Sequence, residues 1–482
     1  KRGKTGLYEG MLLARIANLP LKRVMGSRRV SEWIRTMLHT AYRNLGILIP
    51  DSEELKRGYK PHRVEGALTI APTSGAYYNM AVLDFESLYP SCIDYYNLSY
   101  ETIDCGHDEC KSSRVPGSEH YVCQQKRGIF SALIGALKDL RIHWYKQQVR
   151  QADINPEDRN SAKVISDLLK LFLVSCFGCT IRIPGLACPP LAESVTAYGR
   201  WALQTSWDLA KEYGMYPVYG DTDSLFLDNP ARQQIERLIG KIMDDLGLIL
   251  SIDVTYPLCV LSSAKKAYFG MLADGTPDIK GITLGKSSTP PLFRDIFLEV
   301  VSPLGGVDAP EKLAERIPKV LEILNKRIRD LRKGTFSIKD MEYRVIAWKA
   351  MEGRERRSLA QPYQAIQQLS DRGISVKQRK EVTFVKVKPF RYAKRTFTVK
   401  PTQFATKDEI DIPDYLRKLE LAFQQVLEPL GIKFPAGSKM GLDAYVAPSS
   451  KGLDEDQEQV RKPEEPELEK RREPQRRLDD FE

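Results

Sequence analysis

The chain has 482 residues, of which 42% are hydrophobic and 28% charged, and its net charge is +10. This length exceeds what one hydrophobic core usually supports, so we expect several subdomains. The chain has no uninterrupted run of about 18 apolar residues and no signal peptide, which predicts a cytoplasmic protein without a membrane-spanning segment. The 32 residues from Lys451 onward hold 12 acidic and 8 basic residues, which leaves a net charge of +14 on the rest and suits a partner with phosphate groups.

The first segment predicts helices. Between residues 9 and 50, apolar residues recur at the spacing of one helix face, among them Met11, Ile16, Trp33 and Leu38. We therefore expect an N-terminal helical segment over residues 1–61.

Two acidic segments far apart in the sequence predict a metal site. Residues 81–83 are apolar and predict a strand that ends at Asp84. Farther along, Gly-Asp-Thr-Asp between two apolar runs predicts a hairpin, and Asp221 and Asp223 would point to one side of it. Carboxylates are ligands that Mg²⁺ prefers, and two such ions about 3.5–4 Å apart support phosphoryl transfer. The alternative for this turn alone is that the Asp side chains bond their own backbone.

Two helices between these acidic segments carry basic residues. The apolar spacing over residues 129–140 predicts one helix with Arg141 near its end, and Lys170, Val174 and Phe177 share one face of a second helix. If the helices pair, Arg141 and Lys170 can grip a triphosphate, because a guanidinium suits phosphate oxygens and Lys supplies a mobile charge. A solvated helix face is the commoner explanation for any single basic residue.

Cysteine and histidine residues cluster between positions 105 and 123. Cys105, Cys110 and Cys123 lie there with His107 and His120, and these residue types suit zinc. Their spacing contains no paired Cys-x-x-Cys and so matches no familiar zinc pattern. Free thiols are another interpretation.

The last third of the chain combines helices with positive charge. Residues 313–331 and 415–430 have helical patterns, and the basic stretch 377–400 suits contacts with the backbone of a nucleic-acid duplex. From Pro448 onward Glu, Lys, Arg, Gln and Pro dominate, which predicts a disordered tail.

Five segments resemble the motifs of family B DNA polymerases, in particular those of the archaeal replicative branch. They occur in the order that the family has, and the resemblance covers roughly residues 7–445. Residues 65–67 (EGA) are similar to the linker motif before the polymerase domain. Residues 84–91 (DFESLYPS) and 219–224 (YGDTDS) are similar to the first and second acidic motifs. Residues 170–178 (KLFLVSCFG) are similar to the fingers motif, and 265–270 (KKAYFG) to the lysine-tyrosine motif.

The resemblance implies an α+β fold arranged like a right hand. Its palm would be an antiparallel sheet with helices, its fingers would be helical, and its thumb would be mostly helical. The implied divisions are the N-terminal helical segment (1–61), palm (62–123 and 185–290), fingers (124–184), thumb (291–447) and charged tail (448–482).

The resemblance also assigns roles to residues. Asp84 and Asp223 would hold two Mg²⁺ ions, with Asp221 close by and less essential, and Phe85 would lie at the metal site. Tyr89 would lie under the sugar of the incoming nucleotide and exclude a 2′-hydroxyl, which implies deoxynucleotide substrates; a core aromatic beside Pro90 is the alternative. Further implied contacts are, for the nucleotide, Phe85, Ser87, Leu88, Arg141, Lys170, Val174 and Phe177, and, for DNA, Gly66, Lys265, Lys266, Tyr268 and Lys280.

The chain departs from the family at several points. The family usually has Asn at the position of Val174 and Tyr at that of Phe177, so we expect fidelity or rate to differ from the family norm. About 60 residues precede the linker motif and contain no strand with Asp-x-Glu, so we expect no proofreading and consider a separate exonuclease or N-terminal chain. Archaeal relatives often have a disulfide near the positions of Cys110 and Cys123, which is a third interpretation of these cysteines.

We therefore expect template-directed DNA synthesis, in which a primer 3′-hydroxyl attacks the α-phosphate of a dNTP, by a cytoplasmic, nucleoid-associated enzyme. The alternative is a catalytically weak DNA-binding subunit of a replication complex; Tyr89 argues against a third class, an RNA-templated or ribonucleotide-using enzyme. The last residues resemble a sliding-clamp binding motif through Gln475, Leu478 and Phe481, which a flexible tail would tether to the clamp. A solvated terminus is the other interpretation of that segment.

Overall fold

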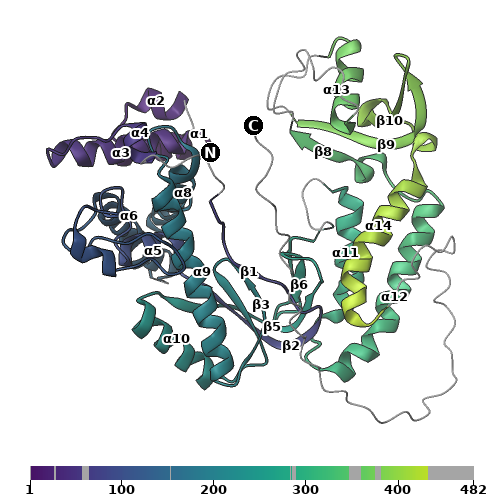
Figure 1. The fold of residues 1–482 in the computed structure, drawn as a ribbon. Coiled ribbons are helices and arrows are strands. Elements are labelled where there is room, and N and C mark those ends of the chain that lie inside the picture. Colours follow the sequence, from purple (N-terminus) through teal and green to yellow (C-terminus); the bar gives the residue numbers. More distant parts are fainter. Residues whose placement is uncertain are drawn as a thin grey trace, which may run out of the picture. The chain divides into compact units, whose positions relative to one another are not determined.

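The structure is a computed structural model and describes residues 2–26, 29–56, 64–151, 153–282, 284, 289–346, 360–374 and 381–432. These residues form helices and antiparallel strands (Figure 1). That arrangement is the α+β class that the sequence predicts. The charged tail and its clamp-binding residues Gln475, Leu478 and Phe481 lie outside the described residues, so those two predictions stay predictions.

A seven-stranded antiparallel sheet carries the candidate site. Its strand order is β1-β3-β4-β2-β5-β6-β7, so the central strand β2 pairs with β4 on one side and with β5 on the other. The strands are β1 (Thr69–Ile70), β2 (Gly75–Phe85), β3 (Tyr216–Asp221), β4 (Ser224–Asp228), β5 (Leu250–Leu261), β6 (Tyr268–Met271) and β7 (Pro277–Lys280).

Each face of this sheet carries a cluster of buried apolar residues. Successive side chains of a strand point to opposite faces, and in β2 Leu83 belongs to one buried cluster while its neighbour Val82 belongs to another. Helix α9 (Pro189–Glu212) contacts β3 and β4, and α10 (Arg232–Leu246) contacts α9 and β5. The apolar residues of these helices complete the first cluster, which makes the sheet a rigid base for residues at its strand ends.

The first of the two predicted basic helices is interrupted. Helix α5 (Leu88–Tyr95) follows β2 and contacts α6 (Ile129–Asp139), which runs into the π-helical turn η2 (Leu140–Tyr145) and then α7 (Lys146–Arg150). Arg141 therefore lies in a π-helical turn rather than at a helix end. Such turns re-aim side chains, because they add one residue to a helical turn.

The second basic helix is α8 (Pro156–Arg182). Asn155 caps it, because its side-chain oxygen accepts hydrogen bonds from the N–H groups of Glu157 and Asp158. By length and composition alone, α8 is apolar enough to cross a membrane, although the sequence analysis expected no such segment. This is a weak indication, since core helices share that composition, and α8 contacts α3, α6 and α9.

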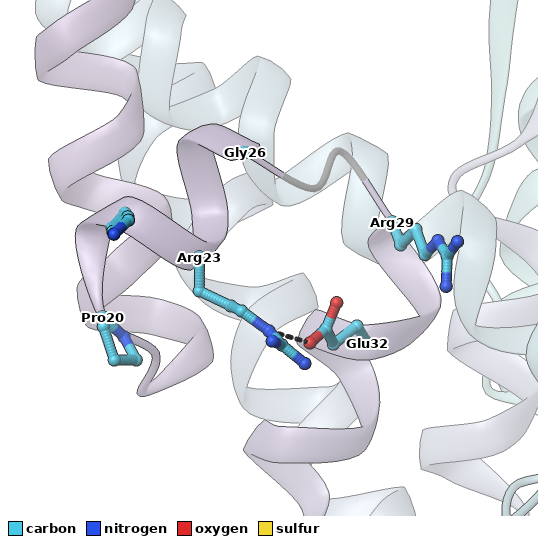
Figure 2. A pocket seen from close by; sticks show the side chains of 6 residues that line it. Pro20, Arg23, Gly26, Arg29 and Glu32 are labelled. Atoms are coloured by element: carbon cyan, nitrogen blue, oxygen red, sulfur yellow. Dashed lines mark hydrogen bonds and ion pairs between the residues drawn. The ribbon is translucent and has the colours of Figure 1, made fainter.

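The N-terminal helices occur where the apolar spacing predicts them. Helix α3 contacts α8, where the rings of Trp33 and Phe172 have centroids 6.0 Å apart. A hollow of about 590 Å³ lies at α2 and α3, and an ion pair of 2.8 Å joins Arg23 to Glu32 beside it (Figure 2). Among the described residues that line this hollow, Glu32 is the single acid, so no second carboxylate is paired with it there. The helices are α1 (Arg2–Ala17), α2 (Leu21–Gly26), α3 (Val30–Asn44) and α4 (Ser52–Lys56).

An insertion connects α5 to α6 and contains the 3₁₀ helix η1 (Asp108–Ser112). His120 is buried in it, with Nδ1 2.8 Å from Asp104 and Nε2 3.1 Å from Glu193 of α9. These two contacts attach the insertion to the helix that covers the sheet.

The disulfide that the resemblance implies between Cys110 and Cys123 is not formed. Their Sγ atoms are 4.0 Å apart, whereas a disulfide bond is about 2.05 Å long. All eight cysteines of the chain are free thiols in the structure, and Cys176 and Cys179 pack in the buried face of α8.

The C-terminal third contains a sheet that the sequence analysis did not predict. The basic stretch 377–400 lies largely in β9 and β10, which form a three-stranded antiparallel sheet with β8. Alternating apolar residues such as Val382 and Phe384 are buried there, and the many positive charges between them obscured this strand pattern. The helical runs that were predicted are present. The elements are α11 (Pro291–Val301), α12 (Pro310–Arg332), β8 (Tyr343–Ile346), α13 (Gln361–Asp371), β9 (Glu381–Tyr392), β10 (Arg395–Pro401) and α14 (Ile412–Leu427).

Candidate functional site

The predicted acidic strand end and the acidic hairpin lie side by side. Strand β2 pairs with β4 so that Asp84 is opposite Ser224, and the N–H of Phe85 donates to the carbonyl of Asp223 at 2.9 Å. Strands β3 and β4 are joined by a two-residue turn, in which Thr222 has φ +62°. The sheet register therefore brings Asp84 and Asp223 together from distant parts of the sequence.

A cavity of about 680 Å³ lies at these carboxylates. Acidic groups from the strands and their ends line it together with basic groups from the two helices. A cavity with charged groups of both signs suits a ligand that combines cations with phosphates. The acids are Asp84, Glu86, Asp223 and Asp253, and the bases are Arg141, Lys146, Arg150 and Lys170.

Two carboxyl groups of the cavity, Asp84 and Asp223, ionise less readily than carboxyl groups in water. The pKa of Asp84 is raised to about 7, mainly by burial and also by the neighbouring Asp223 and Asp253, while Lys146 and Lys170 oppose the shift. Burial also raises the pKa of Asp223. Carboxyl groups in this state are stabilised in their charged form by a bound cation, and their oxygens are the ligands that Mg²⁺ prefers. The side chains present therefore fit a divalent metal ion.

Asp221 does not line this cavity. Its Oδ1 accepts a hydrogen bond from the hydroxyl of Thr69 at 3.3 Å and lies 3.1 Å from Nζ of Lys266. We expected Asp221 and Asp223 to share a face because alternate residues of a strand do so, but β3 ends at Asp221 and the turn follows. A metal-binding role for Asp221 stays a prediction.

Asp253 lines the cavity, and the sequence analysis missed it. It lies on β5 two residues after Ser251, which is the register partner of Asp84. The available signal was an acid inside a strand pattern rich in Val, Tyr and Leu. An isolated acid of this kind is usually an exposed strand residue, so only the strand register shows its proximity to Asp84.

Arg141 and Lys170 both line the cavity, as the helix-pairing argument predicted. Nη1 of Arg141 lies 3.4 Å from the hydroxyl of Ser87, and Nε of the same side chain is buried without a hydrogen-bond partner among the described residues. That donor is available to a ligand oxygen. Lys138, by contrast, binds Asp94 at 2.7 Å, outside the cavity. Lys146, which pairs with Glu86, and Arg150 were not among the predicted site residues.

Two aromatic rings and Val174 form an apolar part of the lining. The ring centroids of Tyr89 and Phe177 are 4.7 Å apart, and 70% of the Val174 side chain is exposed. Gly199 of α9 makes room for Tyr89, because a Cβ atom there would lie 2.7 Å from Cε1 of the ring. Burial raises the pKa of Tyr89 to about 12, so its hydroxyl is neutral. Leu88 also lines the cavity but is 3% exposed, mostly within the core.

Four of the five predicted DNA-binding residues lie along β6, β7 and the loop before them. Nζ of Lys265 donates to the carbonyl of Thr69 at 3.1 Å, and the N–H of Lys266 donates to Tyr219 at 2.9 Å. Tyr268 is the register partner of Lys280. Their role in DNA binding stays a prediction.

Gly66, the fifth of these residues, lies apart from the other four. Its carbonyl accepts a hydrogen bond from Arg200 of α9 at 3.0 Å, and Arg200 also pairs with Glu65 at 3.2 Å. The linker motif is therefore held against the helix that contacts β3 and β4.

Comparison with known proteins gives consistent matches. Residues 19–430 match the family model described as DNA polymerase family B. "DNA polymerase 1" of Sulfolobus acidocaldarius is 35% identical over 441 residues, which are 88% of this chain and 49% of that protein. "DNA polymerase 1" of Saccharolobus solfataricus is 31% identical over 92% of this chain and 51% of that protein. The chain thus spans about half the length of these curated relatives.

A solved structure of a family B DNA polymerase also matches this chain. The family B DNA polymerase of the hyperthermophilic archaeon Pyrobaculum calidifontis matches with a TM-score of 0.62 and 25% identity over 88% of this chain and 54% of that one. The family model alone covers well over half of the chain. From its motifs, its sheet, its acidic cavity and these matches, we conclude that the chain belongs to DNA polymerase family B.

Proposed function

We propose that this chain synthesises DNA on a template by transferring a nucleotidyl group from a dNTP to a primer 3′-hydroxyl. The observation that supports this most is the cavity in which Asp84 and Asp223 lie with Arg141 and Lys170. Carboxylates and fixed cations in one cavity suit a nucleoside triphosphate accompanied by divalent ions. The names of the curated relatives point the same way.

Asp84 and Asp223 would hold two Mg²⁺ ions in this proposal. Such ions, when bound, activate the attacking hydroxyl and neutralise the leaving pyrophosphate. Phe85 contributes at most its backbone carbonyl, because its side chain is apolar and 2% exposed. Asp253 is a third carboxylate at the same cavity, and its charge already acts on Asp84.

The basic side chains orient the triphosphate. Arg141 offers a planar fork with its buried, unpartnered Nε, while Lys170 supplies a point charge from α8. Lys146 and Arg150 add two positive charges on the same helical segment as Arg141. Holding the triphosphate here would place its α-phosphate near the carboxylates, which is the alignment that an in-line displacement needs.

The aromatic rings select the sugar and the base pair. Tyr89 is held between Gly199 and Phe177, so it cannot move away from a 2′-hydroxyl without a clash. Phe177 offers an apolar face to the nascent base pair but no hydroxyl. Val174 is exposed at the cavity and offers no hydrogen bond where the family usually has Asn.

The wider partners follow from the same function. We propose that Lys265, Lys266, Tyr268 and Lys280 contact the primer–template duplex and that the C-terminal residues 475–481 bind a sliding clamp. We propose further that residues 1–482 by themselves extend primers without proofreading, that a separate exonuclease or N-terminal chain is a candidate partner, and that the enzyme works in the cytoplasm at the nucleoid.

Primer extension with a matched pair of variants tests the proposal. Asp223→Asn removes a cavity carboxylate from the turn before β4, whereas Asp228→Asn removes a carboxylate from the far end of β4, outside the cavity. We expect Asp223→Asn to lower the extension rate at least about a hundredfold, since it removes an ion ligand, and to leave primer–template affinity nearly unchanged. We expect Asp228→Asn to extend normally.

The second candidate function is a DNA-binding subunit with little catalysis, which the exposed Val174 favours. In that case the unchanged chain would bind primer–template tightly but fail to extend it with Mg²⁺ and all four dNTPs. Extension that is equal in the unchanged chain and in Asp223→Asn would contradict the two-metal mechanism instead.

A further inference from the structure

Three sulfur atoms and one ring nitrogen converge in the insertion between α5 and α6. Cys105, Cys110 and Cys123 are buried, His107 is half-buried, and their ligand atoms all lie within 4.8 Å of one another. Nδ1 of His107 lies 3.4 Å from Sγ of Cys123 and 3.9 Å from Sγ of Cys110. This cluster is separate from the acidic cavity, whose lining contains none of the four residues.

These separations match those of ligands around one tetrahedral zinc ion. With Zn–S bonds of about 2.3 Å and a Zn–N bond of about 2.0–2.1 Å, tetrahedral angles place two sulfurs about 3.8 Å apart and a sulfur and a nitrogen about 3.6 Å apart. The Sγ atoms of Cys110 and Cys123 are 4.0 Å apart. The side chains are therefore almost at ligand distances already.

The backbone around the cluster also suits metal-bound sulfur. The N–H of Gln124 donates to Sγ of Cys110 at 3.3 Å, and backbone donors of this kind commonly stabilise sulfur that is bound to a metal. The hydroxyl of Tyr121 donates to the carbonyl of Cys105 at 2.6 Å and fixes that ligand's backbone.

We propose that Cys105, His107, Cys110 and Cys123 bind one Zn²⁺ ion in a closed, structural site. Four protein ligands fill a tetrahedron and leave no position for water or substrate, so the ion would take no part in chemistry. The sequence spacing argued against zinc because it lacks Cys-x-x-Cys. The fold supplies the missing proximity, since η1 and the segment at Cys123 face each other across the insertion.

The ion would stabilise the start of α6. Asn97, just after α5, donates from its amide to the carbonyl of Cys123 at 3.1 Å and accepts from the N–H of Gly128, the N-cap of α6, at 2.8 Å. Helix α6 continues into the turn that carries Arg141. The zinc site thus supports the position of a cavity residue without touching it.

Metal analysis of the purified chain tests this proposal independently of polymerase activity. We expect elemental mass spectrometry to find one zinc ion per chain in the unchanged protein. The Cys105→Ala and Cys123→Ala variants should each lose this zinc. The matched control is Cys92→Ala, which removes a thiol that is equally buried but lies in α5. That variant should keep its zinc.

A second measurement uses the unchanged chain and so does not depend on variants that fold. Cys105, Cys110 and Cys123 should resist alkylation until a zinc chelator is added, while the reactivity of Cys92 stays the same with and without it. Cobalt in place of zinc should give thiolate-to-metal absorption bands. A folded chain without zinc, iron in its place, a Cys110–Cys123 disulfide, or zinc that survives both substitutions would each overturn the proposal.

Discussion

At the residue scale, Tyr89 is the side chain whose surroundings determine its role most directly. It packs against Phe177 with centroids 4.7 Å apart, and it approaches Gly199 of α9 so closely that a Cβ atom there would lie 2.7 Å from Cε1 of the ring. A ring held in this way acts as a fixed wall, because moving it would require repacking of both α8 and α9.

Replacing Tyr89 by Ala should relax sugar selection. Removal of the wall admits a 2′-hydroxyl, so the preference for dNTP over NTP, measured as the ratio of kcat/KM values, should fall at least about tenfold. The control is Tyr95→Ala, since Tyr95 is exposed on α5 and does not line the cavity. An unchanged ratio in Tyr89→Ala would place the steric wall elsewhere.

Also at the residue scale, the position of Gly281 cannot accommodate a residue with a Cβ atom. Its φ is +65°, and a Cβ atom would lie 1.5 Å from the carbonyl oxygen of Lys266. Gly281→Ala should therefore destabilise the chain by about 2 kcal/mol or more, with a lower thermal unfolding temperature. Gly240→Ala in α10 is the control: nothing lies within 4 Å of its Cβ position, and alanine in a helix should be neutral or stabilising by up to about 1 kcal/mol.

At the element scale, the insertion between α5 and α6 depends on the charge of His120. Burial lowers the pKa of this imidazole, but hydrogen bonds and charges from Asp104 and Glu193 outweigh burial, so the net pKa is raised above 6.5. Protonated imidazole donates to both carboxylates, whereas neutral imidazole donates to one. The contribution of His120 to stability is therefore complete below pH 6.5 and is lost as the pH rises through its folded-state pKa.

Thermal unfolding of the unchanged chain and of His120→Gln at several pH values tests this dependence. The difference between their midpoints should be largest near pH 5.5 and should shrink on raising the pH toward 9. A difference that stays constant over this range would mean that His120 contributes through packing alone.

The helices and strands also show which elements could be predicted from residue spacing in the sequence and which could not. Amphipathic spacing predicted α1, α3, α12 and α14 because helix burial follows a period of 3.6 residues. The same reasoning missed β8, β9 and β10, since their charged residues alternate with only short apolar stretches. It also placed Arg141 at a helix end, whereas the residue lies in a π-helical turn that no pattern announces.

At the scale of the whole molecule, the positive charge outside the tail predicts strongly salt-dependent DNA binding. If at least four phosphates are contacted, a plot of log K against log salt should have a slope of about −3.6 or steeper, which fluorescence anisotropy between about 50 and 200 mM salt can measure. Lys265→Ala should reduce the slope by about 1. Lys241→Ala, which removes a lysine paired with Asp245 on α10, should leave it unchanged.

A flat salt dependence would contradict phosphate contacts as the basis of affinity. An equal change of slope in the Lys265 and Lys241 variants would instead mean that net charge, rather than position, determines binding. Either result would contradict the prediction that the loop before β6 contacts the DNA duplex.

The sequence by itself determined the family, the α+β class, and the grouping of Asp84 and Asp223 with Arg141 and Lys170. Asp84, Lys170 and Asp223 lie in motifs whose order is informative, and Arg141 follows a run with helical spacing. Only the tertiary structure shows that Asp253 lines the cavity and that Asp221 instead forms an ion pair with Lys266. The reason is that strand register brings together residues that are far apart in the sequence. The tertiary structure likewise brings together Cys105, His107, Cys110 and Cys123, whose spacing in the sequence matches no familiar zinc pattern. Linear spacing constrains neighbours on one helix or strand, whereas a ligand set from several segments depends on how those segments pack.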